Sequence, residues 1–154
     1  MLFVISQDKK PLNTCHPAKA RKLLSSGIAA VWKRYPLTII LKKEVQLATV
    51  AEHRLKIDPG SKTTGLAILE GNRVVFAAEL IHRGLAIKDA LTSRRAIRRS
   101  RRYRKTRYRK CRFNRSKPDG WLPPSLMSRV HNILTWVNRL QKICPITAIS
   151  RIVG

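Results

Sequence analysis

A run of basic residues in the middle of the chain constrains its folding more than any other feature. The segment from Arg94 to Arg115 holds 13 lysines and arginines in 22 positions, and no acidic residue occurs between Ala90 and Lys117. The segment lacks proline and glycine and is rich in arginine, a good helix former, so a helix is predicted over residues 90–117. Its few apolar residues cannot form the stripe by which helices usually pack against a core. The helix is therefore expected to lie outside the core.

The charge of this segment also predicts its partner. Like charges three and four positions apart repel, so the isolated helix should be partly disordered and should become ordered on phosphates. The whole chain of 154 residues has 33 Lys and Arg against 8 Asp and Glu, a net charge of +25. Such a chain repels itself unless a polyanion neutralises it. Nucleic acid is the first expected partner; an anionic membrane, which usually needs an apolar face beside the charge, is the second. A solvated basic linker is the alternative without a partner.

Arginine makes bidentate contacts with phosphate and stacks on bases, and tyrosine offers a further stacking surface. Charge alone does not distinguish RNA from DNA. The residues expected to bind RNA, mainly by neutralising phosphates, are Arg94, Arg95, Arg98, Arg99, Arg101, Arg102, Arg104, Arg107, Tyr108 and Arg109.

The flanking segments predict an α+β fold. Residues 1–50 form a small module with strands over Leu2–Ile5, Thr38–Leu41 and Val45–Val50. They also contain a helix over Pro17–Ser26 that Asn13 or Thr14 caps and Gly27 ends.

Residues 51–89 contain two strands, Gly65–Leu69 and Arg73–Ile81, joined by a Gly71-Asn72 turn. Residues 118–154 contain an amphipathic helix capped by Ser125 and ended by Pro145, then a strand from Ile146. The three tryptophans are expected to anchor the cores, and they are Trp32, Trp121 and Trp136.

One candidate for chemistry is the octet from Asp58 to Gly65, Asp-Pro-Gly-Ser-Lys-Thr-Thr-Gly. An aspartate at the end of one strand, before a glycine-containing corner into the next, is how two-metal nucleases of the ribonuclease H type present their first carboxylate. The same corner binds phosphate in actin-like kinases, and it is also an ordinary Asp-Pro-Gly β-turn. It is not a Walker A loop, because Lys62 precedes the second glycine.

The sequence contains few residues placed to bind a metal ion. A two-metal site needs about three or four carboxylates, and only Asp58 lies at such a strand corner, although Glu79 lies in a predicted strand. The four histidines are scattered.

The cysteines, Cys15, Cys111 and Cys144, are too widely spaced for a zinc knuckle or a disulfide framework. We expect reduced thiols and an intracellular location, in the cytoplasm or an organelle matrix. The apolar N-terminal run is too short for a signal peptide.

In their order along the chain, these motifs resemble the IscB family of transposon-encoded RNA-guided nucleases. Residues 10–21 are similar to its N-terminal PLMP domain, with Asn13-Thr14 in place of Met-Pro. Residues 57–65 resemble its first RuvC segment, a partial ribonuclease H-like sheet. Residues 94–115 resemble its arginine-rich bridge helix, including Arg-Arg-x-x-Arg-Arg at 94–99, and residues 120–126 resemble the segment that follows.

The resemblance implies four regions: a PLMP-like module (1–50), a first RuvC segment (51–89), a bridge helix (90–117) and an amphipathic helix with the start of a second RuvC segment (118–154). It implies a long structured guide RNA as partner and DNA reached through the guide. Asp58 would take the place of a metal-binding catalytic aspartate. The second-segment glutamate, the third segment and the HNH domain of the family do not follow residue 150 in this sequence.

We therefore expect a structured-RNA-binding protein related to IscB, without a complete nuclease site and without a cofactor of its own. Asp58 would be vestigial, or would bind Mg²⁺ only if another chain completed the site, as in a split RNA-guided nuclease. The other alternative is a structural component of a large ribonucleoprotein such as a ribosome, with ribosomal RNA and protein partners. A membrane partner is not expected. Whether the chain is an enzyme stays open.

Overall fold

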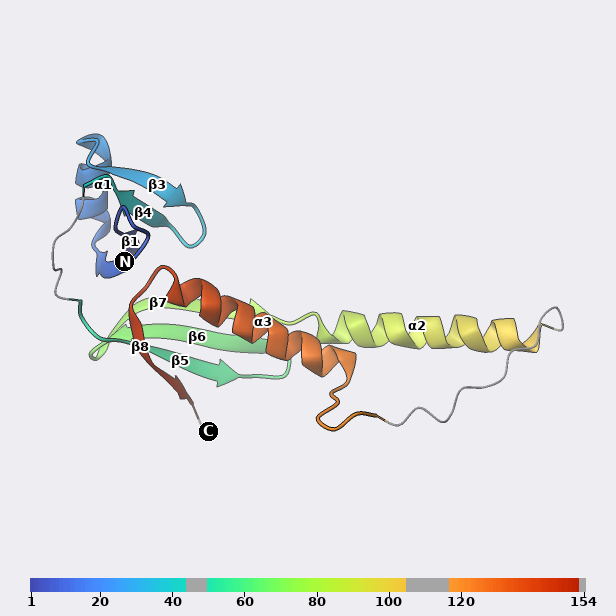
Figure 1. Cartoon of the computed structure of the whole chain (residues 1–154). Helices are drawn as coiled ribbons and strands as arrows, with labels where there is room; N and C mark the ends of the chain where they lie inside the picture. The colour runs from blue at the N-terminus through green and yellow to red at the C-terminus, as the bar shows by residue number, and fades with distance from the viewer. Residues whose placement is uncertain (44–49, 105–116, 153–154) are drawn as a thin grey trace. The chain divides into compact units, whose positions relative to one another are not determined.

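The computed structural model describes residues 1–43, 50–104 and 117–152, and it is a mixed α+β fold as expected (Figure 1). The predicted strand within Val45–Val50 lies almost wholly outside the described residues. The chain divides into two compact units, one of residues 1–81 with 133–154 and one of residues 82–132. The elements are β1 (Leu2–Ile5), β2 (Pro11–Cys15), α1 (Pro17–Ser25), β3 (Ala29–Lys33), β4 (Thr38–Leu41), β5 (His53–Pro59), β6 (Thr63–Glu70), β7 (Arg73–Ile81), α2 (Gly84–Tyr103), α3 (Pro124–Gln141) and β8 (Ile146–Arg151).

The N-terminal sheet has the strand order β2-β1-β4-β3, in which β1 pairs with β4 in parallel and the other pairs are antiparallel. Strands β1 and β4 have the predicted bounds, but β2 and β3 were not predicted. Both are edge strands. Strand β2 begins at Pro11, an unfavourable residue inside a sheet that is tolerated at the start of an edge strand.

The predicted N-cap of α1 is wrong. Asn13 and Thr14 lie in β2, and His16 caps the helix instead: its Nδ1 accepts a hydrogen bond from the backbone N–H of Ala18 at 3.2 Å. Pro17 occupies the first turn, where its missing N–H costs nothing. The helix ends where predicted, before Gly27, which has a positive φ of 70°.

Successive side chains of β1 point to opposite faces of its sheet, and both faces of this strand are buried. Val4 belongs to the core of the N-terminal module, together with Ala20 of α1 and Ile39 of β4. Phe3 points the other way and joins the second core, where its ring centroid lies 5.4 Å from that of Phe76 on β7. This tilted pair adds specific aromatic contact to the burial of apolar area.

The second sheet has the order β7-β6-β5-β8. Strands β5, β6 and β7 form an antiparallel meander, and β8 pairs in parallel with β5. The β6–β7 turn lies at Gly71-Asn72 as predicted, with Gly71 at a φ of 57° that favours glycine. The parallel return of β8 requires a crossover connection.

The last turns of α3 cover one face of this sheet. Val137 and Leu140 are buried there with Leu55 of β5 and Ile68 of β6. The helix begins at Pro124, one residue before the predicted cap, and ends at Gln141 rather than at Pro145. It ends early because a tight turn follows, in which the N–H groups of residues 143 and 144 both bond to the carbonyl of Leu140.

The predicted role of the tryptophans is only partly correct. Trp136 packs against the second core, as expected. Trp32 and Trp121 are 41% and 42% exposed, so neither anchors a core. Trp121 instead has the Lys117 ammonium 4.3 Å from its ring centroid, a cation–π contact.

Within the described ranges of the chain, no helix is both long and apolar enough to cross a membrane.

Two leucines of α3 offer a matched test of this packing. Leu140 is fully buried and Leu134 is 52% exposed, so Leu140→Ala should lower the free energy of unfolding by about 2–5 kcal/mol. Leu134→Ala should change it by roughly 0.5 kcal/mol or less. Urea unfolding followed by circular dichroism measures both values. Equal effects of the two substitutions would contradict the described packing of α3.

Candidate nucleic-acid interface

Helix α2 has no buried residue along its 20 positions, as expected for a helix outside the core. It begins at Gly84, six residues before the predicted start, because residues 85–91 contain good helix formers and no helix breaker. Arg83 precedes it without a side-chain capping bond. From residue 105 to residue 116 the predicted helix lies outside the described residues.

Six of the ten predicted RNA-binding residues lie in this helix, and they are Arg94, Arg95, Arg98, Arg99, Arg101 and Arg102. Arg104 follows as an extended C-cap residue, while Arg107, Tyr108 and Arg109 are outside the described residues. At 100° per residue the six arginines fall within an arc of roughly 160° of the helix surface. We call this arc the arginine face.

The rest of the helix surface is of a different kind. Apart from Asp89 it holds uncharged residues, which include Ala86, Ala90, Ser93, Ala96 and Ser100. The cations are thus gathered on one side rather than spread around the helix, so several guanidinium groups can reach the same array of phosphates.

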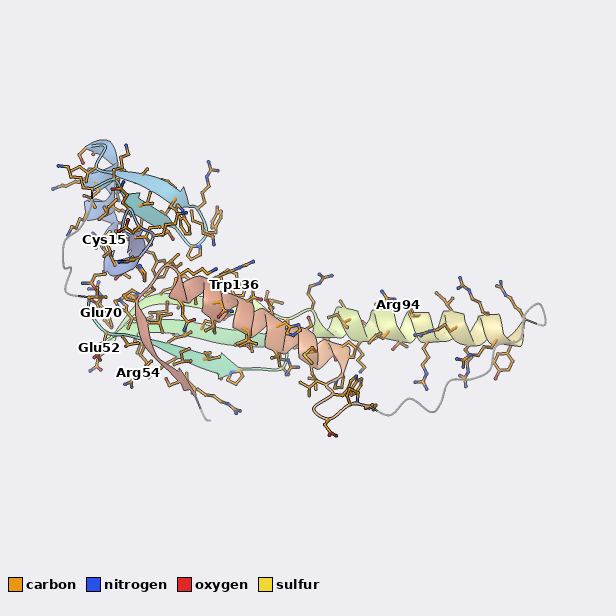
Figure 2. The ribbon with its side chains drawn as sticks, viewed as in Figure 1. Cys15, Glu52, Arg54, Glu70, Arg94 and Trp136 are labelled. Atoms are coloured by element: carbon orange, nitrogen blue, oxygen red, sulfur yellow. The ribbon has the colours of Figure 1, made fainter. Side chains whose placement is uncertain are left out.

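The arginine face has little internal compensation. Asp89 is the one acidic residue of α2, and it lies outside the arginine face. Arg98 donates from Nε to the carbonyl of Arg94 at 3.2 Å, which fixes one guanidinium along the helix. Arg94 and its neighbouring side chains project away from the ribbon (Figure 2). A field of one sign, carried by exposed planar donors, suits a polyanion.

The start of α2 is tied to α3 by a polar contact. His82 Nδ1 and Asn132 Nδ2 lie 3.5 Å apart, within the unit of residues 82–132. Burial lowers the pKa of His82 below its ordinary value, and the positive charge of Arg129 lowers it further. Both causes favour the neutral ring, which avoids adding another positive charge beside a basic segment.

The second predicted site is the corner at Asp58. Strand β5 continues through Pro59, so the turn comprises residues 60–62 and Asp58 is the penultimate residue of its strand. A Cβ at Gly60 would collide with the carbonyl oxygen of Thr63. Glycine is therefore required there by the turn itself, and no bound phosphate is needed to explain it.

Asp58 lies in a cross-strand row with Gly65 of β6 and Glu79 of β7. Directly paired residues share a sheet face, so the two carboxylates flank the bare backbone of Gly65. A Cβ at Gly65 would come within 3.4 Å of the Cβ of Asp58. The row is the floor of a shallow hollow of ≈ 470 Å³ that Lys56 and Ile152 also line.

This row does not make a metal site by itself. Two carboxylates fall short of the three or four that a two-metal site needs. Lys56 adds a positive charge to the same hollow. Among the residues that the structure describes, no group of three His, Cys, Asp or Glu is placed to hold a metal ion. We therefore derive no hydrolytic step at Asp58.

The fold and its arginine face define a mixed α+β protein with an exposed cationic helix. The family model described as RRXRR protein matches residues 2–152, so the chain belongs to the RRXRR family. Residues 98–102 of α2, Arg-Arg-Ser-Arg-Arg, have that pattern literally. No curated protein matches the chain.

The environment of His82 predicts its titration. Its pKa should lie below 6.5, so its contribution to stability is complete above that pH and declines as the pH falls. Arg129→Gln should raise the pKa only in part, because burial is the larger cause. Added salt should do the same by screening Arg129. Histidine NMR titrations measure these pKa values, and a midpoint at or above the ordinary value would contradict the described surroundings of His82.

Proposed function

We propose that this protein binds structured RNA and that the arginine face of α2 is its principal contact. The observation that carries the proposal is the gathering of six exposed arginines on one side of a helix without a buried residue. A helix of this kind gains nothing from a core, and the repulsion among its charges is relieved by a ligand that carries many negative charges at close spacing.

Membership of the RRXRR family and the resemblance to IscB support RNA as the polyanion. The order of motifs, from the N-terminal module through the Asp58 corner to the arginine helix, is the order found in that nuclease family. On this proposal the RNA is a long, folded one, either a guide RNA or ribosomal RNA. Its bends and junctions bring phosphates from several strands onto the six arginines, and a DNA target would be reached through a guide.

A nuclease role has a specific but incomplete basis. Asp58 is the penultimate residue of its strand and pairs with Gly65, with Glu79 in the same row. This is the position expected of the first metal-binding carboxylate in a ribonuclease H-like site. We propose that Mg²⁺ would be held here only with further carboxylates from another polypeptide, as in a split nuclease. The binding of RNA by α2 does not depend on this.

The salt dependence of binding tests the role of the arginine face. Changing Arg94, Arg98, Arg101 and Arg102 to alanine retains helix propensity and removes four charges. If each arginine neutralises one phosphate, the slope of log K against log salt should become shallower by about 3.6 for duplex RNA, which is about 0.9 for each phosphate. Fluorescence anisotropy with a labelled RNA hairpin at several salt concentrations measures this slope.

The control removes the same charge elsewhere. Arg54, Arg73, Lys142 and Arg151 are exposed residues outside α2, and their joint replacement by alanine also removes four charges. It should leave the slope nearly unchanged. Equal slopes for the two variants would mean that net charge alone attracts the RNA, and the proposed interface would be wrong.

A further inference from the structure

The end of β3 and the turn that joins it to β4 carry a second surface that the arginine face does not explain. Within seven residues it exposes four apolar side chains, two of them aromatic. Tyr35 is 85% exposed and Trp32 is 41% exposed. Single exposed apolar residues are ordinary, but four of them within seven residues of one hairpin are a candidate binding surface. We call this group the aromatic turn; its members are Val31, Trp32, Tyr35 and Leu37, with Lys33 and Arg34 between the two rings.

The backbone beneath these side chains is held in place. Thr38 is fully buried and its hydroxyl donates to the carbonyl of Pro36 at 2.9 Å. The carbonyl of Leu37 accepts a hydrogen bond from the N–H of Phe3 in β1. The turn closes the β3–β4 hairpin of the N-terminal sheet (Figure 1). Tyr35 is thus presented on an anchored turn and Trp32 on the adjoining end of β3, which lowers the entropy lost when they bind.

The charge of the N-terminal module favours a polyanion as the ligand of the aromatic turn. Residues 1–43 hold nine lysines and arginines and one acidic residue, Asp8. Such a surface attracts polyanions. Aromatic rings beside cations are the combination by which proteins bind unpaired nucleotides, because each base has a face for stacking while its phosphate meets the cation. In A-form duplexes the base faces are hidden, so loops, bulges and ends of a folded RNA offer them.

We propose that Trp32 and Tyr35 stack on unpaired bases of the RNA, with Lys33 and Arg34 on the adjoining phosphates. This inference rests on the proposed function, because it divides recognition of one RNA between two chemistries. The arginine face neutralises phosphates whether the strand is paired or not. The aromatic turn prefers nucleotides whose bases are free, and it supplies a preference for single-stranded segments that charge cannot supply.

Two RNAs of equal nucleotide number separate these contributions. One is a blunt-ended duplex of two strands, which has no loop, and the other is a shorter duplex in which one strand continues as a single-stranded tail. The full chain carrying Trp32→Ala and Tyr35→Ala should lose about tenfold or more in affinity for the tailed RNA, as stacking of one or two bases predicts. It should bind the blunt duplex like the wild type, with an unchanged salt slope. The double change Trp32→Phe and Tyr35→Phe retains both rings and should retain most of the affinity.

Two controls show whether stacking is the cause. Trp121→Ala removes an equally exposed tryptophan whose ring already faces Lys117, and it should leave the preference for the tail unchanged. Trp32→Leu with Tyr35→Leu keeps an apolar surface without aromatic faces and should behave like the alanine variant. A leucine variant with full affinity for the tailed RNA would overturn the proposal, because apolar contact without stacking would then suffice for binding.

The remaining outcomes distinguish this inference from the function on which it rests. If the alanine variant and the wild type bind both RNAs alike, the aromatic turn does not contact RNA, while RNA binding by α2 stands. If the wild type binds neither RNA at moderate salt, both proposals are wrong. Ultraviolet crosslinking of the wild type to the tailed RNA needs no substitution, and it should join the tail to the peptide that contains Trp32 and Tyr35.

Discussion

Repulsion among the arginines of α2 is the constraint on which the rest of the structure depends. Six guanidinium groups within one arc cannot be desolvated together, because a buried charge without a partner costs several kcal/mol. The helix therefore contributes no residue to a core. Folding energy has to come from the remaining elements, and the two buried clusters consist of residues from the sheets, from α1, from the last turns of α3 and from the turn after it. Folding and charge are thus carried by separate parts of the chain.

The sequence predicted the elements in which the local residue pattern favours the same structure that the packing of the whole fold requires. Strand β7 follows a glycine turn and keeps its predicted bounds, and α2 was expected outside the core because no apolar stripe runs along it. The edge strands β2 and β3 were missed since their composition is poor in strand signals and their hydrogen bonds depend on neighbours distant in sequence. Trp32 was misplaced for a related reason: residue type favours burial, but the hairpin geometry exposes it.

The row at Asp58 shows a limit of a different kind. Counted from the Gly71-Asn72 turn without interruption, Gly65 would pair with Ala78, and Glu79 would point to the opposite face from Asp58. The register shifts between Ile68 and Leu69, and Gly65 pairs with Glu79 instead. A bulge of one residue reverses which face a side chain occupies. No feature of the sequence marks this bulge, so the proximity of the two carboxylates could be found only in the structure.

The two proposed binding surfaces would differ in how they discriminate among RNAs. Phosphates are alike along any RNA, so an arginine face discriminates among RNAs only through the spacing of their strands. Base faces are accessible only where bases are unpaired, and aromatic rings can stack on those bases alone. An exposed tyrosine and tryptophan have no evident use in folding, since the core of the N-terminal module consists of smaller aliphatic residues. Their exposure, at the end of β3 and on the turn held by Thr38, is the reason for proposing a ligand that offers both stacking surfaces and negative charge. A folded RNA with unpaired segments meets both requirements, whereas a duplex or a purely apolar partner meets only one.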